Sequence, residues 1–149
     1  MLPVFGAAWL QGAALDMNLL LFSLPVSAWV TAILLINEVP DIAADAATGK
    51  RTLPVRLGLR GTAMLYLAIH VSAVAAVTWM TISGALPLLS PLVPLGLLLL
   101  VGQAAKAIGR GISDRPAMTK AIESTLAIHA LGTVWLSACV LFTIFRSTV

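Results

Sequence analysis

Residues 17–58 read MNLLLFSLPVSAWVTAILLINEVPDIAADAATGKRTLPVRLG, and this stretch sets the fold class. Its first 21 residues, 17–37, carry no charge. An α-helix needs about 20 predominantly apolar residues to cross the hydrocarbon core of a bilayer. Three acids follow at once, at positions 38, 41 and 45. Because charged side chains are costly inside a membrane unless they pair, face water or hold a cation, the stretch predicts a spanning helix that ends in a polar surface segment.

The composition of the whole chain agrees with a membrane protein. The 149 residues are 60% hydrophobic and 10% charged, with a mean hydropathy of +1.02. This excludes an ordinary soluble domain, in which roughly a quarter of the residues are charged. The net charge of +3 does not indicate nucleic acid, because the basic residues cluster between apolar runs, as in the loops of membrane proteins. We therefore expect a lipid bilayer as a partner and no nucleic acid.

The apolar runs predict an all-α polytopic transmembrane bundle of about five helices. Ser83, Gly84 and Pro87 supply a turn between two of them, and the Gly- and Pro-containing residues 106–120 predict a loop. The first run is too short for a span, so we expect it to be the end of a helix in a chain truncated at its N-terminus. The expected helices cover residues 2–15, 18–45, 60–82, 88–108 and 119–145.

Loop charge predicts the orientation of this bundle. Eight of the nine basic residues follow the second or the fourth expected helix, and only Arg146 falls on the other side. Cytoplasmic loops carry an excess of Lys and Arg. The acidic segment is therefore expected on the cytoplasmic face. The eight residues are Lys50, Arg51, Arg56, Arg60, Lys106, Arg110, Arg115 and Lys120.

The acidic segment has the spacing of a metal site. Asn37, Asp41 and Asp45 lie four residues apart, so a continuous helix would stack them on one face. Two carboxylates can hold one Mg²⁺, and an amide oxygen can add a third ligand. Pro40 has no N–H to donate to the carbonyl of Ile36, so we expect a kink that leaves this oxygen free beside the acids.

Cations follow the acids directly. Gly49 is placed to end the helix as a C-terminal cap. Lys50 and Arg51 come next, and Arg56 and Arg60 lie a few residues further on. Carboxylates for a hard dication with cations just beyond for phosphate oxygens suit a metal-bound diphosphate.

The string N-E-x-P-D-x-x-x-D-x-x-x-G-K-R-T-L-P-x-R-L-G, residues 37–58, resembles the second aspartate-rich motif of the UbiA-type intramembrane prenyltransferases. Its residue pattern is most similar to that of the dihydroxynaphthoate (menaquinone) branch of this family. The resemblance implies nine transmembrane helices with two acidic motifs, one after helix 2 and one after helix 6. Residues 1–149 would then be the C-terminal portion of that domain, from the tail of helix 5 through helix 9.

The resemblance also implies an activity. Mg²⁺ on the acidic motifs would hold a prenyl diphosphate, and an aromatic acceptor such as a quinone precursor would receive the isoprenyl group. Six residues of this chain match the motif in its metal and diphosphate positions. The implied roles are metal ligands for Asn37, Asp41 and Asp45, of which the two aspartates are also catalytic, and diphosphate contacts for Lys50, Arg51 and Arg56.

A first acidic motif of the form N-D-x-x-D-x-x-x-D is not in the sequence, and Asp16, Asp114 and Glu123 are isolated acids. We therefore expect the chain alone to be inactive. The main alternative is a non-catalytic membrane fragment or subunit that binds lipid diphosphate. A membrane CDP-alcohol phosphotransferase is disfavoured because its D-G-x-x-A-R signature is missing. A transporter is disfavoured because the acids lie at a helix end.

Several histidine, tryptophan and cysteine residues within the apolar stretches are expected to have structural roles. His70 and His129 are expected to be buried and hydrogen-bonded, since an isolated histidine inside an apolar helix needs a polar partner. Trp29 and Trp135 are expected to pack in the core. Cys139 has no second cysteine to pair with and is expected to be a small packing residue.

Charged residues near the fourth and fifth expected helices have local explanations. Lys120 and Glu123 lie three residues apart, which predicts an ion pair on one helix. Lys106 and Arg110 share a helix face at the same membrane boundary. For these two we favour contacts with lipid headgroups over a second contact with the substrate phosphate.

Overall fold

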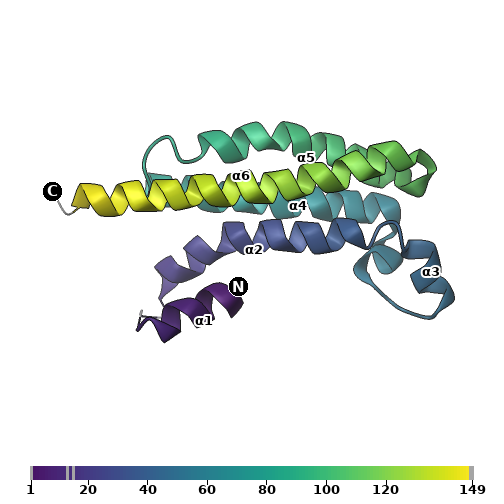
Figure 1. Ribbon diagram of the computed structural model, residues 1–149, viewed down its shortest axis with the longest axis horizontal. Helices are drawn as coiled ribbons and strands as arrows, with labels where there is room; N and C mark the ends of the chain where they lie inside the picture. Colours follow the sequence, from purple (N-terminus) through teal and green to yellow (C-terminus); the bar gives the residue numbers. More distant parts are fainter. Residues whose placement is uncertain (1, 13, 15, 148–149) are drawn as a thin grey trace.

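The computed structural model describes residues 2–12, 14 and 16–147, and across these residues the regular structure consists of helices (Figure 1). The prediction of an all-α fold is confirmed. The elements are α1 (Leu2–Leu10), α2 (Met17–Asn37), α3 (Ile42–Ala47), α4 (Leu53–Ile82), α5 (Leu92–Arg110), the 3₁₀-helix η1 (Gly111–Asp114) and α6 (Arg115–Ser147).

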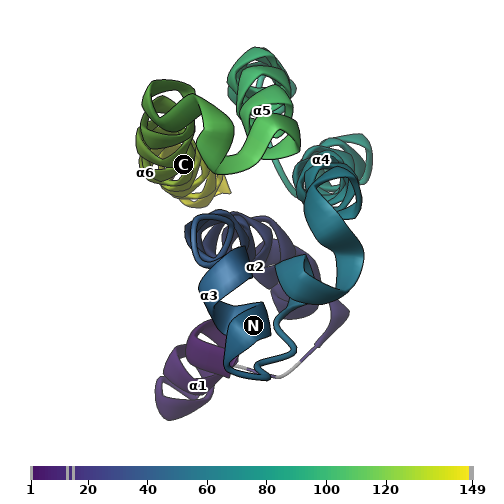
Figure 2. The same cartoon turned by 90° about the vertical axis from the view of Figure 1, so that its right-hand side faces the viewer.

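Four long helices form an antiparallel bundle. Helix α2 packs on α4 and α6, and α5 packs on the same two helices, so the four close a ring (Figure 2). Helix α1 lies beside α2, and α3 lies beyond the end of the bundle next to the start of α4 (Figure 1). The core holds mainly aliphatic and small side chains, with a few aromatic ones, from all four long helices. Its members include Trp29, Ile36, Tyr66, Val77, Val101, Ile108, Met118 and Ile128.

Three stretches of the described chain are long and apolar enough to cross a membrane: Leu19–Asn37, Leu53–Ile82 and Leu92–Arg146. The third is folded back on itself at η1, because α5 and α6 run antiparallel and in contact (Figure 1). At 1.5 Å per residue, the 19 residues of α5 span about 28 Å and the 33 residues of α6 about 50 Å. Helix α5 therefore matches a hydrocarbon core of about 30 Å, and α6 is longer than that core.

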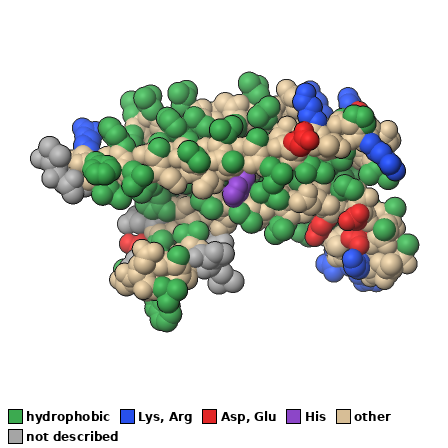
Figure 3. Space-filling view, viewed as in Figure 1, with side chains coloured by type: hydrophobic (Ala, Val, Ile, Leu, Met, Phe, Trp, Pro, Cys, Tyr) green, Lys and Arg blue, Asp and Glu red, His purple; other side chains and the backbone are tan. Residues whose placement is uncertain are grey.

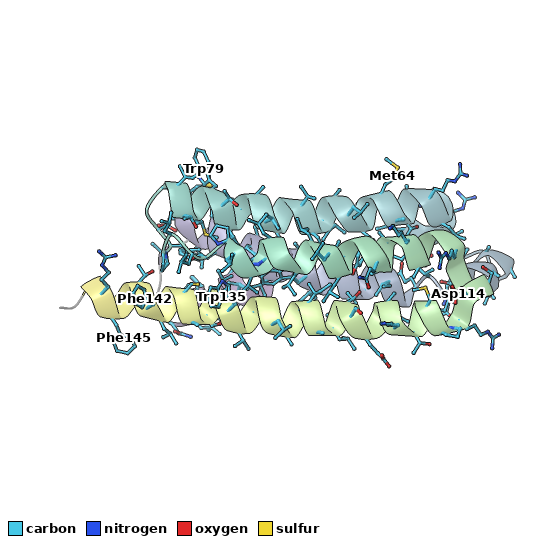
Figure 4. The ribbon with its side chains drawn as sticks, turned by 90° about the horizontal axis from the view of Figure 1, so that it is seen from above. Met64, Trp79, Asp114, Trp135, Phe142 and Phe145 are labelled. Atoms are coloured by element: carbon cyan, nitrogen blue, oxygen red, sulfur yellow. The ribbon has the colours of Figure 1, made fainter. Side chains whose placement is uncertain are left out.

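On the face that Figure 3 shows, hydrophobic side chains are spread between the two ends of the bundle, with a histidine at mid-length. Met64, Trp79 and Phe145 point away from the helices (Figure 4) and are 72%, 60% and 69% exposed. An apolar exterior over the length of a bilayer is what lipid contact requires, since large exposed apolar patches are rare on soluble monomers.

The expected helix over 18–45 is interrupted at residues 38–41, and the prediction of one continuous helix is wrong. Helix α2 ends at Asn37, and the N–H of Val39 donates to the carbonyl of Ile36 at 3.2 Å. This carbonyl is therefore not left free by Pro40, contrary to the prediction. Pro40 offers no N–H to continue the ladder, and the chain turns before α3 begins at Ile42. The helix is therefore interrupted next to Pro40, whereas a kink in a continuous helix was expected.

Other helix boundaries differ from the expected ones for local reasons. Helix α4 begins at Leu53, seven residues before the expected start, and bends at Gly58, where φ is +65°. The expected loop over 106–120 is mostly helical, and the chain reverses within Gly111–Asp114. Asp114 accepts from the N–H of Ala117 at 3.2 Å and so caps the start of α6. Helix α1 ends at Leu10; positions 13 and 15 of the expected helix lie outside the described residues.

Buried polar groups join the helices at mid-bundle. The Tyr66 hydroxyl donates to Thr125 Oγ1 at 2.7 Å, because the single Thr125 hydroxyl proton is used on the carbonyl of Ala121 at 2.8 Å. His70 Nδ1 donates to the Tyr66 carbonyl at 2.9 Å, so the prediction of a buried, hydrogen-bonded histidine is confirmed there. His129 is only half-buried, and the same prediction is wrong for it.

The expected packing roles are confirmed at Trp29 and Cys139, which are 2% and 7% exposed. Trp135 is half-buried, and its Nε1 donates to the Ser90 carbonyl at 2.9 Å, which ties α6 to the loop before α5.

The contact between α2 and α6 depends on Gly132. A Cβ at this position would lie 2.7 Å from Cη2 of Trp29. Gly132→Ala should therefore destabilise the bundle by about 1–3 kcal/mol through overpacking, as measured by unfolding of the purified protein in mixed detergent micelles. Gly102→Ala is the matched control, because nothing lies within 4 Å of its new methyl group. Equal stability of the two variants would contradict the packing of Trp29 on α6.

Candidate functional site

The segment between α2 and α4 carries the predicted site, and α3 is its only regular element. Helix α3 ends in a Schellman motif: the N–H of Lys50 donates to the Asp45 carbonyl at 2.9 Å, and the N–H of Gly49 donates to Ala46 at 3.2 Å. Gly49 adopts φ +76°, which L side chains rarely reach. The prediction that Gly49 ends a helix is confirmed. The cap turns the chain so that Lys50 returns over the helix it follows.

The two aspartates lie one helical turn apart. The N–H of Asp45 donates to the carbonyl of Asp41 at 2.8 Å, which places both residues in one α-turn. Asp41 occupies the N-cap position of α3 with an exposed side chain that makes no capping hydrogen bond. Asp45 is 8% exposed. Asn37 belongs to α2, on the other side of the break, so the predicted three-residue helix face is wrong for this residue.

Asp45 already has a cationic partner. Lys50 Nζ lies 3.1 Å from Asp45 Oδ1, and the side chains of the pair are 68% and 11% exposed. A predicted metal ligand and a predicted phosphate contact are therefore joined to each other. The ammonium neutralises a carboxylate that is nearly out of water, which would otherwise be unfavourable. A dication that binds Asp45 through Oδ1 must displace Lys50, whereas no ion pair of the described residues involves Asp45 Oδ2.

The remaining cations lie at the same end of the bundle. Arg51 follows the cap, and Arg56 and Arg60 lie in the first turns of α4; all three side chains are exposed. Figure 3 shows most of the charged side chains gathered at this end, around α3 and the turn between α5 and α6. Arg146 lies in the last turn of α6, at the other end of the bundle. The charge asymmetry read from the sequence is thus a property of the folded bundle.

The acids fit a metal ion only as part of a larger ligand set. Among the described residues, no three His, Cys, Asp or Glu side chains come together as a metal cage. Asp41 and Asp45 supply two carboxylates one turn apart. Mg²⁺ commonly binds one or two carboxylates, keeps several waters and takes the rest of its ligands from substrate phosphate. The donor set therefore suits a dication that arrives with a diphosphate.

One neighbour of this segment cannot be recognised from the sequence. Pro40 lines a cavity of about 250 Å³ together with Arg115, Met118 and Ile122 from the start of α6. Arg115 is 75 residues away in the chain. It entered the sequence analysis only as a loop charge, since no local spacing links it to the acidic segment.

These features define an α-helical membrane protein with an acidic and basic motif at one end of an antiparallel bundle. A sequence model of the UbiA prenyltransferase family matches residues 1–121. The chain belongs to the UbiA prenyltransferase family, and it is an integral membrane protein by its apolar helices and by that membership.

The chain is also similar to part of a curated protein. A 1,4-dihydroxy-2-naphthoate octaprenyltransferase from Haemophilus influenzae is 34% identical over 90 residues. The match covers 53% of this chain and 29% of the relative, so the chain spans less than a third of that protein. No solved structure matches the chain.

The cap at Gly49 should control the order of α3. Gly49→Ala forces a side chain into a left-handed conformation at a cost of roughly 1–2 kcal/mol, so the last turn of α3 should fray. Hydrogen exchange of the Lys50 amide should accelerate by about tenfold or more. Gly109→Ala is the control, because Gly109 is helical and nothing lies within 4 Å of a Cβ there. Unchanged exchange at Lys50 would contradict the cap.

Proposed function

We propose that this chain supplies the diphosphate-binding part of a Mg²⁺-dependent prenyltransferase, which moves an isoprenyl group from a prenyl diphosphate to an aromatic acceptor. The observation that carries the proposal is the pairing of Asp41 and Asp45 in one α-turn at the charged end of an apolar bundle. Membership of the UbiA family supports it independently.

The site residues divide into two groups. Asp41 and Asp45 would hold Mg²⁺, with the amide of Asn37 supporting from the end of α2. The ion would supply positive charge to the departing diphosphate. Lys50, Arg51 and Arg56 would bind the phosphate oxygens, as expected for cations placed directly beyond the acids.

Lys50 links the two groups. In the structure its ammonium neutralises Asp45 at 3.1 Å, and its side chain is exposed enough to swing outward. We infer that Lys50 moves from Asp45 to a phosphate oxygen when the diphosphate binds. The exchange keeps Asp45 neutralised before and after binding. As the allylic C–O bond breaks, negative charge grows on the diphosphate, and cations already in place stabilise it without reorganisation.

The acceptor and the orientation are part of the proposal. The relative from Haemophilus influenzae is named for a dihydroxynaphthoate acceptor, which supports a quinone precursor and a role in menaquinone-type biosynthesis. The eight basic residues at the acidic end support a cytoplasmic position for the site. A prenyl chain extending from a diphosphate at this end would enter the apolar region of the membrane.

A second candidate is binding of a lipid diphosphate without turnover. It is favoured because Lys50 already neutralises one acid of the pair, and because no larger acidic cluster forms among the described residues. Ionising an allylic diphosphate in a low-dielectric site needs nearly complete neutralisation of the leaving group. Binding needs less.

Substitution of the acids tests the catalytic role. In a prenyltransferase that contains this chain, Asp41→Asn and Asp45→Asn should each lower transfer from a radiolabelled prenyl diphosphate by at least about 100-fold, since each removes a ligand charge. Lys50→Ala should cost roughly tenfold, the size of one charge-assisted hydrogen bond. Glu123→Gln is the control, because Glu123 is an exposed acid on α6. Near-normal turnover of both aspartate variants would refute the assignment.

Reconstitution separates catalysis from binding. The 149-residue chain in liposomes with a prenyl diphosphate, an aromatic acceptor and Mg²⁺ should form no product, because one carboxylate pair holds only part of the metal–diphosphate cluster. Weak, Mg²⁺-dependent binding of the diphosphate should remain and should be lost in Asp41→Asn. Product that forms with Mg²⁺ and disappears in Asp41→Asn would show that the chain is a complete enzyme.

A further inference from the structure

A second basic site lies on the outer surface of the bundle, in the groove between α5 and α6. The groove has a volume of about 230 Å³ and a floor of four alanines, at positions 104, 107, 117 and 121. Lys106, Arg110 and Lys120 line it, together with the polar side chains of Gln103 and Ser124. Figure 2 shows α5 and α6 on the side of the bundle away from α3. The groove is thus separate from the proposed diphosphate site.

Two of the three cations form no ion pair with the described residues. Arg110 Nη1 lies 3.2 Å from Asp114 Oδ2 and is neutralised within the turn. Lys106 and Lys120 are exposed, and the part of the chain that the structure describes contains no ion pair to either. The predicted pair between Lys120 and Glu123 is therefore not formed.

The two lysines lie on opposite walls of the groove at similar heights. Lys106 comes five residues before Gly111, and Lys120 comes six residues after Asp114. Because α5 and α6 run antiparallel from η1, these similar spacings place the lysines at nearly the same distance from the turn. Two ammonium groups converge on one groove, an arrangement that an anion would stabilise.

The walls of the groove become apolar toward the middle of the bundle. On α5, Leu99 lies one turn before Gln103 on the same stripe and is 75% exposed. On α6, Leu131 continues the stripe of Lys120 and Ser124 and is 54% exposed. The groove therefore changes from cationic at the bundle end to apolar at mid-bundle. A phospholipid has the same order of groups, from phosphate to acyl chain.

We propose that this groove binds an anionic phospholipid, with its phosphate between Lys106 and Lys120 and an acyl chain along Leu99 and Leu131. Gln103 and Ser124 can donate hydrogen bonds to the phosphate or the glycerol oxygens. The alanine floor lets the acyl chain approach the helices closely. Basic pockets between transmembrane helices on the cytoplasmic side commonly hold anionic headgroups. The bound lipid joins α5 to α6 at the level of the membrane surface.

The test compares lipids and variants by native mass spectrometry of the purified protein in detergent. Phosphatidylglycerol should bind saturably, and phosphatidylcholine with the same acyl chains should bind at least about tenfold more weakly. Lys106→Gln/Lys120→Gln should lose this preference. The control, Arg60→Gln/Arg115→Gln, removes the same charge from the same end of the bundle outside the groove and should keep the preference.

Additional variants and a competing anion complete the test. Lys106→Arg/Lys120→Arg should retain binding, and the single Lys→Gln variants, checked for helicity by circular dichroism, should each lose part of it. Equal binding of the two lipids would overturn the proposal, as would equal losses in the groove and control variants. Displacement of phosphatidylglycerol by millimolar inorganic phosphate would also overturn it, because the groove would then be a site for a soluble anion.

Discussion

Every peptide N–H and C=O inside the hydrocarbon must find its partner within the chain, and helices meet this need segment by segment. The bundle of α2, α4, α5 and α6 follows from that constraint. Among the described residues, the segments that join the long helices lie at the ends of the bundle. The break at Pro40 lies at such an end, where the Asp41 side chain is exposed and Lys50 neutralises the nearly buried Asp45. The acids can therefore sit directly after an uncharged span without a large desolvation cost.

The acidic segment is organised by its own short-range contacts. The Schellman cap at Gly49 brings Lys50 back over α3, where it pairs with Asp45, five residues earlier in the chain. A nearly buried carboxylate with an exposed ammonium partner is suited to exchange. The carboxylate stays in place while its counter-charge can be replaced. This arrangement connects the local fold to the proposed binding of a metal-bound diphosphate.

One end of the bundle carries two charged surfaces on separate sides. The side of α3 presents carboxylates among cations, which suits a dication with a phosphorylated substrate. The groove between α5 and α6 presents two lysines that form no ion pair with the described residues, which suits a lipid anion. The same excess of positive charge that orients a membrane protein is divided between these two surfaces by helix packing.

Local chemistry could be read from the sequence: the apolar spans, the charge asymmetry, the helix stop at Gly49 and the turn between Asp41 and Asp45 all depend on neighbours within a few residues. The position of Asn37 could not be read from the sequence. A proline is compatible with either a kink or a full break of a helix, and here the helix breaks before Pro40. Packing alone placed Arg115 beside Pro40 and Lys106 across from Lys120. Helix periodicity shows which faces are apolar, but it does not show which faces meet, since many apolar surfaces in a bundle are chemically equivalent until side chains such as Trp29 and Gly132 fit together.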